Sequence, residues 1–219
     1  MFRLGSDGVF RADALQRLSW LRHGFGSKQS ANWPELHGLA TLKQIHSDRV
    51  VLVNSPGPQG EGDALISGKR NINLAIRTAD CLPILIADPQ SRSMAAIHAG
   101  WRGVVSEIVP KTVDALRRQF DSNPEDLVIA IGPSIGSCCF EVGPEVAIQF
   151  ASFFPEFDLT TRTKVDLAET ICRQLRQKGV GREQIYLSNR CTFCDRGLFD
   201  SYRRDKQEAG RMTTVIGLT

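Results

Sequence analysis

The sequence lacks any apolar run long enough to cross a membrane. The longest such run, Leu82–Ala87, already contains Pro83, whereas a membrane-spanning helix needs roughly 20 apolar residues. The net charge of +3 is too small to indicate nucleic-acid binding. The first residues, Met1–Leu15, contain no apolar signal-peptide core. We therefore expect a cytoplasmic protein with neither membrane nor nucleic-acid partners.

Two common phosphate-binding motifs are also absent. The sequence contains neither G-x-G-x-x-G nor G-x-x-x-x-G-K-[ST], so dinucleotide-binding and P-loop folds lose their main support. Because a cytoplasmic chain is kept reduced, the six cysteines are not expected to form a disulfide framework. Each cysteine is instead a candidate metal ligand, nucleophile or packing residue.

Short β-rich segments dominate the first half of the chain, and helical periodicity becomes frequent in the second half. We expect strands at Arg49–Asn54, Asn71–Arg77, Leu82–Ala87, Ser93–His98, Leu127–Gly132, Gln184–Leu187 and Met212–Leu218. Helices are expected over Val104–Phe120, with a kink or a start at Pro110, over Val165–Lys178, capped by Gly179, and over Gly143–Phe150. The glycine-rich Asn54–Gly62 is predicted to be a surface loop. These elements indicate one α+β domain over residues 1–219, in which helices cover sheets.

Three residues at the ends of predicted strands carry metal-ligand chemistry: His46, Cys81 and His98. Two imidazoles and a thiolate make a zinc site of the catalytic type, with three protein ligands and one open position. The same donors suit zinc or copper much better than magnesium or calcium. No short motif joins the three residues, so a second hypothesis stays open. On that hypothesis Cys81 is a small buried hydrophobe and both histidines are ordinary hydrogen-bonded residues.

Four stretches of the sequence resemble, in the same order, a family of laccase-like proteins. They are TADCLPIL, AAIHAGWRG, AIGPSIGSCCFEVG and FDSYRRDKQEAGR. Weaker matches at Arg22–Phe25, Gln44–His46 and Asp63–Ile66 extend the resemblance from Arg22 to the C-terminus. The family is known both as multicopper polyphenol oxidases and as peptidoglycan editing factors. Its members are described as zinc-dependent purine nucleoside phosphorylases with adenosine deaminase and methylthioadenosine phosphorylase activity.

This resemblance implies a fold, a metal site and a set of substrates. The implied fold is a four-layer α/β/β/α sandwich, similar to the catalytic domains of cytotoxic necrotizing factors. The family's metal ligands fall on His46, Cys81 and His98, and imply Zn²⁺ with copper as the alternative. Purine nucleosides and phosphate are the implied substrates. Ser27–Thr41 is shorter than the family's equivalent segment, so substrate contacts from that segment are not carried over.

The implied deamination requires a nucleophile and a group that moves a proton. A zinc ion held by Cys81 and the two histidines would lower the pKa of a water molecule, which could then attack C6 of adenine. Asp80 and Asp63 are the candidate carboxylates for the proton. Alternatively, Asp80 holds the second ring nitrogen of a ligand histidine.

The implied phosphorolysis requires a site for the phosphate dianion. Arg77 lies four residues before Cys81, and Arg102 lies four residues after His98. The planar guanidinium group suits phosphate, so we expect these two arginines, and Arg203 after them, to bind the anion. His23 lies in the Arg-His-Gly-Phe match and is expected either to contact substrate or to orient a main-chain group.

Three other functions stay open. One is a copper-dependent polyphenol oxidase, although a multicopper enzyme needs many more histidines than four. The second is a cysteine amidase or hydrolase that edits serine-bearing muramyl peptidoglycan precursors, with Cys81 as nucleophile and His98 as base. The third is a binding module that holds structural zinc. Cys191-x-x-Cys194 has no second pair near it in the sequence and Cys138-Cys139 is expected to pack, so neither is predicted to bind a metal.

Overall fold

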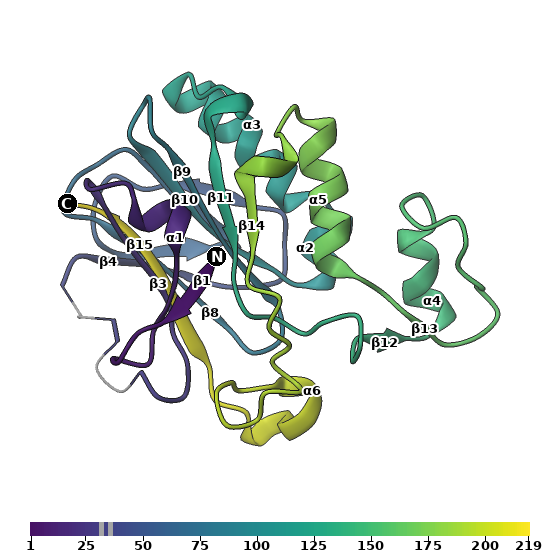
Figure 1. Ribbon diagram of the computed structural model, residues 1–219. Coiled ribbons are helices and arrows are strands. Elements are labelled where there is room, and N and C mark those ends of the chain that lie inside the picture. The colour runs from purple at the N-terminus through teal and green to yellow at the C-terminus, as the bar shows by residue number, and fades with distance from the viewer. Residues whose placement is uncertain (31–32, 35–36) are drawn as a thin grey trace.

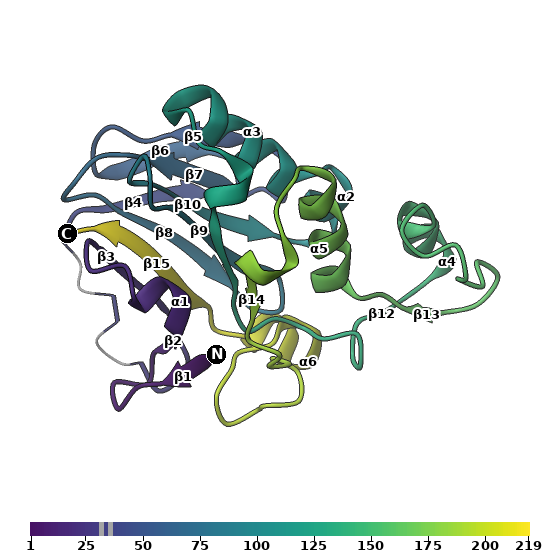
Figure 2. The ribbon, with the colours of Figure 1, turned by 45° about the horizontal axis from the view of Figure 1, so that its top comes forward.

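The chain folds into two β-sheets that pack face to face, with helices along one of them (Figures 1 and 2). The computed structural model describes residues 1–30, 33–34 and 37–219. Among these residues, the larger sheet has seven strands, in the spatial order β1 (Phe2–Leu4), β2 (Phe10–Ala12), β3 (Leu21–Phe25), β15 (Met212–Leu218), β8 (Asn73–Thr78), β4 (Leu39–Lys43) and β6 (Gly57–Glu61). The smaller sheet has six described strands, in the order β14 (Ile185–Leu187), β11 (Val128–Ile131), β9 (Leu82–Asp88), β10 (Ser93–Ala99), β7 (Ala64–Ser67) and β5 (Val50–Leu52). The predicted α+β class is confirmed.

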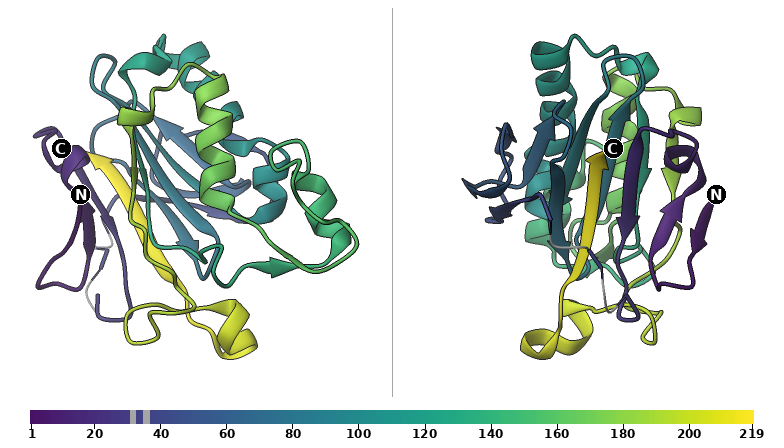
Figure 3. Two further views of the ribbon diagram at one scale, coloured as in Figure 1. Left: turned by 45° about the vertical axis from the view of Figure 1, so that its right-hand side comes forward. Right: turned by 90° about the vertical axis from the view of Figure 1, so that its left-hand side faces the viewer.

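Helices cover the outer face of the six-stranded sheet. They are α2 (Trp101–Val105), α3 (Ile108–Phe120) and α5 (Leu167–Gln177). Shorter elements in the described chain are α1 (Asp13–Gln16), α4 (Pro144–Ala147), α6 (Tyr202–Asp205) and the 3₁₀ segments Pro124–Asp126, Ile148–Phe150, Arg182–Gln184 and Lys206–Glu208. The small sheet of β12 (Glu141–Val142) and β13 (Thr163–Lys164) extends with α4 away from the main body, as Figures 1 and 3 show.

The central strands of the smaller sheet are buried on both faces. In β9, Leu82, Ile84 and Ile86 pack in the core beneath the helices, whereas Leu85 and Ala87 pack between the two sheets. Every residue of β9 and of β10 is buried. Burial on both faces explains why these segments are continuous apolar runs without alternation.

The predicted helices are found, with bounds set by local main-chain geometry. The region Val104–Phe120 holds two helices, because Glu107 between them has a left-handed φ of 60°. Pro110 is the third residue of α3, where its missing N–H has no helical partner to lose. The helix α5 begins after Asp166, whose side chain accepts from the main-chain N–H of Glu169 at 2.9 Å. It ends before Gly179, which has the φ of 86° typical of a helix C-cap.

One strand lies where the sequence predicts a surface loop. The strand β6 falls inside Asn54–Gly62 and pairs in parallel with β4 at the edge of the seven-stranded sheet. Main-chain pairing does not require apolar side chains, and Pro58 is tolerated because an edge strand has one unpaired side. The loop prediction was wrong for these residues.

The second layer of helices implied by the four-layer sandwich is not found in the described chain. Among the described residues, α3 and α5 are the helices longer than five residues, and both pack on the six-stranded sheet. The likeness to cytotoxic necrotizing factors stays a prediction. The described chain also contains no helix with the length and apolar character needed to span a membrane. Within the segment Ser27–Thr41, residues 31–32 and 35–36 lie outside the described residues.

Candidate functional site

The structure brings the three predicted metal ligands together. His46 follows β4, Cys81 lies between β8 and β9, and His98 is the penultimate residue of β10. One ligand atom from each residue lies within 4.8 Å of the other two. Sγ of Cys81 is 3.9 Å from Nε2 of His46, and the two imidazole rings meet edge to face with centroids 4.8 Å apart. Three residues far apart in the sequence therefore converge on one point.

The turn that carries His46 is fixed to the neighbouring strand by Gln44. The side-chain amide of Gln44 donates to the main-chain oxygen of Arg77 and accepts from its N–H, and both distances are 2.8 Å. This pair of hydrogen bonds imitates a β-ladder where β4 has already ended. His46 then adopts a left-handed φ of 58°, which turns the chain toward the two other ligands.

Gly100 leaves the space in which the ligands meet. A Cβ atom at this position would lie 2.8 Å from Cδ2 of His46 and 3.2 Å from Sγ of Cys81. The φ of Gly100 is −71°, which other residues adopt readily. Position 100 therefore requires glycine because a side chain would not fit there, and not because of its main-chain conformation.

A single buried carboxylate, that of Asp63, positions two of the three ligands. Its Oδ1 lies 2.7 Å from Nδ1 of His98 and accepts from the main-chain N–H of His46 at 3.0 Å. Its Oδ2 accepts from the N–H of Ile45 at 3.3 Å and from both the N–H and the hydroxyl of Ser47 at 2.6 and 2.7 Å. Because Nδ1 of His98 is engaged by Asp63, Nε2 is the ring nitrogen left to bind a metal.

The charges of the cluster support one another. Burial raises the pKa of Cys81, but hydrogen bonds from His46 and His98 outweigh it and bring this pKa down from 9.0 to about 7. Burial lowers the pKa of His98, but its bonds to Asp63 and Cys81 dominate and raise it to about 9. Burial likewise opposes ionisation of Asp63, yet bonds from His98 and Ser47 lower its pKa to about 2. Without a metal ion, a thiolate of Cys81 is thus accessible at neutral pH beside the protonated ring of His98, which Asp63 holds in place.

This donor set fits a resident metal ion. One thiolate and two imidazoles are preferred ligands of zinc, and also suit copper. A carboxylate on the outer nitrogen of a ligand histidine is the usual support of such a site, and Asp63 supplies it. His46, Cys81 and His98 would hold the ion and leave one coordination position open. The structure therefore supports a metal site and leaves the identity of the metal open.

Two clefts meet at the cluster, and four residues line both of them: His46, Ala79, Cys81 and Tyr202. The first cleft has a volume of about 520 Å³ and is also lined by Leu42, Gln44, Arg77, Thr78, His98 and Arg211. The second has a volume of about 290 Å³ and is also lined by Asp80, Trp101, Arg102, Ile135, Phe140, Leu167, Arg203 and Lys206. Two candidate ligands, His46 and Cys81, thus lie on the wall shared by the two clefts, while His98 lines the first cleft only. Each cleft also contains cationic side chains.

The three predicted anion-binding arginines lie in these clefts. Arg77 lines the first cleft, whereas Arg102 and Arg203 line the second. The guanidinium of Arg102 lies 4.5 Å from the ring of Trp101, and that of Arg203 lies 5.4 Å from the ring of Phe140. The second cleft therefore combines apolar rings with positive charge.

Asp80 does not contact a ligand histidine among the described residues. Its Oδ1 accepts from the hydroxyl of Thr192 at 2.6 Å, and its Oδ2 accepts from the hydroxyl of Ser201 at 3.1 Å and from the N–H of Arg203 at 2.6 Å. Asp80 thus fixes the start of α6 beside the cleft. The carboxylate that holds a ligand histidine is Asp63 instead.

His23 lies apart from both clefts. It is 4% exposed on β3, and its Nε2 accepts from the main-chain N–H of Ala12 at 3.0 Å. Burial, together with the charge of Arg11, lowers the pKa of His23 from 6.5 to about 4. Of its two expected roles, the described structure supports the one in which His23 orients a main-chain group.

Sequence reasoning missed several residues that line the clefts. Tyr202 is 44% exposed and separates the two clefts, with the guanidinium of Arg211 5.8 Å from its ring. Lys206 adds a third cation to the second cleft. Tyr202, Lys206 and Arg211 all belong to FDSYRRDKQEAGR, so the family resemblance of that stretch could have pointed to them.

The segment Gly132–Gly136 matches G-x-S-x-G, the nucleophile motif of α/β-hydrolases. In those enzymes the serine lies on a sharp turn between a strand and a helix. Here Ser134 forms a β-bridge with Cys191 instead.

Similar proteins of known sequence are named as nucleoside enzymes. A purine nucleoside phosphorylase of Deinococcus radiodurans is 43% identical over 82% of this chain and 70% of its own length. One of Clostridium acetobutylicum is 36% identical over 84% of this chain and 79% of its own. The purine nucleoside phosphorylase YfiH of Escherichia coli is 38% identical over 81% of this chain and 72% of its own length.

Solved structures have the same fold. The hypothetical protein YfiH of Bacillus licheniformis superposes with a TM-score of 0.89 at 26% identity, covering 100% of this chain and 99% of that one. YlmD of Geobacillus stearothermophilus superposes with a TM-score of 0.89 at 27% identity, covering 99% of this chain and 98% of that one. The family model described as multi-copper polyphenol oxidoreductase laccase matches residues 27–219. The chain therefore belongs to this laccase-like family, as its four sequence stretches predict.

Proposed function

We propose that this protein is a zinc-dependent purine nucleoside phosphorylase that also deaminates adenosine and cleaves methylthioadenosine. One observation carries the proposal: His46, Cys81 and His98 converge where two clefts with cationic side chains meet, and His46 and Cys81 line both clefts. The names of relatives at 36–43% identity support the substrate class. The deaminase and methylthioadenosine activities rest on the family resemblance.

The chain's own residues have distinct tasks in this proposal. When bound, a zinc ion with three protein ligands keeps an open position at which it acts as a Lewis acid. Asp63 holds Nδ1 of His98 and can share a proton with that nitrogen, so the imidazole keeps one orientation. Tyr202 offers an exposed ring between the two clefts, against which a purine can stack.

We assign phosphate to the second cleft. Arg102, Arg203 and Lys206 line it together, and three cations balance a dianion better than the two arginines of the first cleft. The carboxylate of Asp80 keeps Arg203 in place by accepting a hydrogen bond from the main-chain N–H of Arg203. The larger first cleft, with Gln44 and Arg77 on its wall, is then the site of the nucleoside.

The test is metal analysis coupled to turnover on one preparation. Inosine cleavage should require both phosphate and zinc, adenosine should yield inosine, and Cys81→Ser should lose both activities with the ion. A chelator should abolish these activities, whereas a thiol hydrolase would survive the chelator and be inactivated by iodoacetamide. Zinc-loaded protein that turns over none of these nucleosides would contradict the proposal. Oxidation of polyphenols by copper-loaded protein alone would identify the copper enzyme instead.

A further inference from the structure

A second group of possible metal ligands lies outside the two clefts. Cys138 and Cys139 lie in the turn that follows β11, and Cys191 and Cys194 lie in the turn that follows β14. The strands β11 and β14 are parallel neighbours in the six-stranded sheet. Since neighbouring parallel strands end at the same edge of a sheet, the two pairs meet although they are far apart in the sequence. The expectation that Cys191-x-x-Cys194 has no second pair was therefore wrong.

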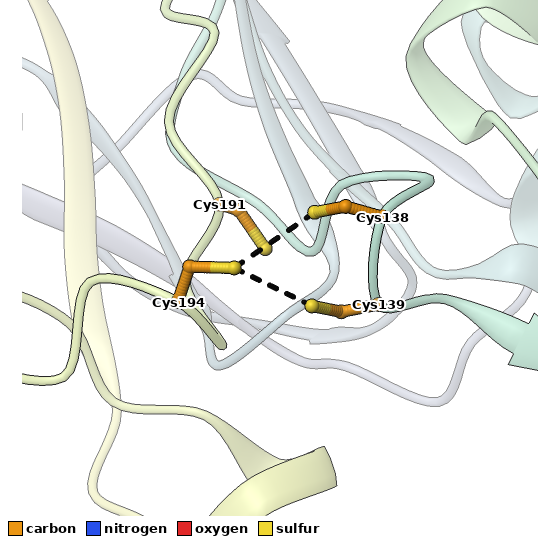
Figure 4. Close-up of side chains that lie close together, drawn as sticks. All are labelled: Cys138, Cys139, Cys191 and Cys194. Carbon is orange, nitrogen blue, oxygen red and sulfur yellow. Dashed lines mark hydrogen bonds between the residues drawn. The ribbon is translucent and has the colours of Figure 1, made fainter.

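The four sulfur atoms form a compact group, shown in Figure 4. All four lie within 4.8 Å of one another. Sγ of Cys194 is 3.9 Å from Sγ of Cys138 and 3.4 Å from Sγ of Cys139. Four sulfurs bound tetrahedrally to one ion at about 2.3 Å are separated by about 3.8 Å. The arrangement thus matches the sulfur spacing of a single tetrahedral ion.

A tight turn explains how adjacent cysteines can serve one ion. In an extended strand, neighbouring side chains point to opposite faces. Here the main-chain N–H groups of Cys139 and Phe140 both donate to the oxygen of Gly136 at 2.9 Å, which curls the chain. Figure 4 shows the side chains of Cys138 and Cys139 directed from this turn toward Cys194.

Hydrogen bonds hold the main chain around the four sulfurs in place without a bound ion. The N–H of Gly136 donates to Sγ of Cys191 at 3.3 Å. A Cβ atom on Gly136 would lie 3.2 Å from Sγ of Cys138 and 3.5 Å from Cβ of Cys191, so glycine gives the sulfurs room. The N–H of Thr192 donates to the oxygen of Ser134 at 3.0 Å, which ties the two turns together. The ligand geometry therefore does not depend on the ion alone.

We propose that Cys138, Cys139, Cys191 and Cys194 bind one structural zinc ion, separate from the His46–Cys81–His98 site. Four thiolates close the coordination shell, which is the hallmark of a structural rather than a catalytic zinc site. Cys138 and Cys194 are exposed and the other two are half-buried, so the ion can enter from solvent. All four cysteines are free of disulfides in the described structure.

The zinc ion would stabilise the turn that carries Asp80 and Cys81 beside the two clefts. Ile135 precedes Gly136 at the start of the turn that carries the first cysteine pair, and its N–H donates to the main-chain oxygen of Asp80 at 2.9 Å. Thr192 lies inside the second pair, and its hydroxyl donates to the carboxylate of Asp80 at 2.6 Å. Asp80 precedes the ligand Cys81 in the chain. Fixing the two cysteine turns therefore fixes the turn from which Cys81 reaches the first site.

The first experiment counts metal ions and thiols. Untagged protein is expressed in medium containing zinc, iron and copper, and its metals are measured by elemental analysis. Wild-type protein should hold about two zinc ions per chain, and after denaturation with a chelator all six cysteines should react as thiols. Iron in place of the second zinc would overturn the proposal, as would a thiol count reduced by disulfides.

Substitutions then assign each ion to its site. Cys194→Ser should retain about one zinc ion, and so should Cys81→Ser. Cys172→Ala, at a buried cysteine of α5 outside both groups, is the matched control and should retain both. In the Cys81→Ser protein, X-ray absorption should show about four sulfur neighbours at about 2.3 Å from zinc. An unchanged zinc content in Cys194→Ser, or nitrogen neighbours in that spectrum, would overturn the assignment.

Discussion

Oδ1 of Asp63 lies 2.7 Å from Nδ1 of His98, and this pair organises the candidate active site. The same carboxylate binds the main-chain N–H groups of the turn that presents His46. One side chain thus sets the ring of one ligand and the main-chain path of another. Asp63 itself is fixed by the sheet, because its N–H and oxygen pair with Arg49 and His98.

Asp63→Asn should weaken zinc binding at the first site by about 10–100-fold. The amide keeps the size of the carboxylate but places an NH₂ group opposite N–H donors. Zinc affinity by competition with a chromophoric chelator measures the effect. Asp88→Asn is the matched control, since Asp88 is equally buried and binds the turn at the other end of β9. Equal zinc affinities in the two variants would contradict the role given to Asp63.

Asp80→Asn should leave the zinc content of the first site intact and change the second cleft. Its carboxylate holds the N–H of Arg203 and the hydroxyls of Thr192 and Ser201, so an amide would loosen the start of α6. We expect a higher KM for phosphate, with kcat for adenosine deamination changed much less. A loss of deamination by about 10²–10⁴-fold with zinc retained would instead make Asp80 the group that moves the proton.

The sequence alone predicts the fully buried strands and the two longer helices, because burial leaves a clear apolar pattern. Strand β9 is apolar on both faces, and α5 has a capping aspartate and a terminal glycine. Strand β6 leaves no such pattern. It is held by main-chain pairing at a sheet edge and contains glycine and proline, so its composition indicates a loop.

Residue chemistry together with the family resemblance predicts the three candidate ligands of the first site, but it does not predict their partners. The pairing of Asp63 with His98 joins residues on different strands through the fold, and no spacing in the sequence reveals it. The four-cysteine group is hidden for a similar reason. Its two pairs are brought together by the parallel pairing of β11 with β14, which the sequence does not specify.

Gly100→Ala should reduce zinc occupancy of the first site without a large loss of stability. The added methyl group would meet the ring of His46 at 2.8 Å and Sγ of Cys81 at 3.2 Å. Because His46 is exposed, its ring can move away, and the displacement disrupts the ligand set rather than the core. Gly197→Ala, where a methyl group meets nothing within 4 Å, is the control. Full zinc occupancy with unchanged affinity in Gly100→Ala would refute the argument from space.

Arg102→Ala and Arg77→Ala should separate phosphate from nucleoside binding. Arg102 shares the second cleft with two other cations, so its loss should raise the KM for phosphate about tenfold or more. Arg77 lies in the first cleft, and its loss should raise the KM for inosine and leave that for phosphate nearly unchanged. Both variants should keep their zinc. The opposite pattern of KM values would move the phosphate site to the first cleft.

His23 should make the protein less stable as the pH falls from about 6.5 to about 4. The pKa of the folded imidazole is lowered to about 4 by burial and by Arg11, whereas in the unfolded chain it stays near 6.5. The unfolded state therefore binds a proton in this window that the folded state does not, and the free energy of unfolding falls by roughly 3 kcal/mol. Above pH 6.5 both states are neutral, so the effect vanishes there.

Urea unfolding of wild type and His23→Gln between pH 7 and pH 4 measures this contribution. The amide oxygen of glutamine can accept the N–H of Ala12 that His23 now accepts, and it does not titrate. His37→Gln is the control, because His37 is exposed. The difference in unfolding free energy between wild type and His23→Gln should shift with pH in favour of the variant, while His37→Gln follows wild type. Parallel curves for all three proteins would show that His23 takes up its proton equally in the folded and unfolded states.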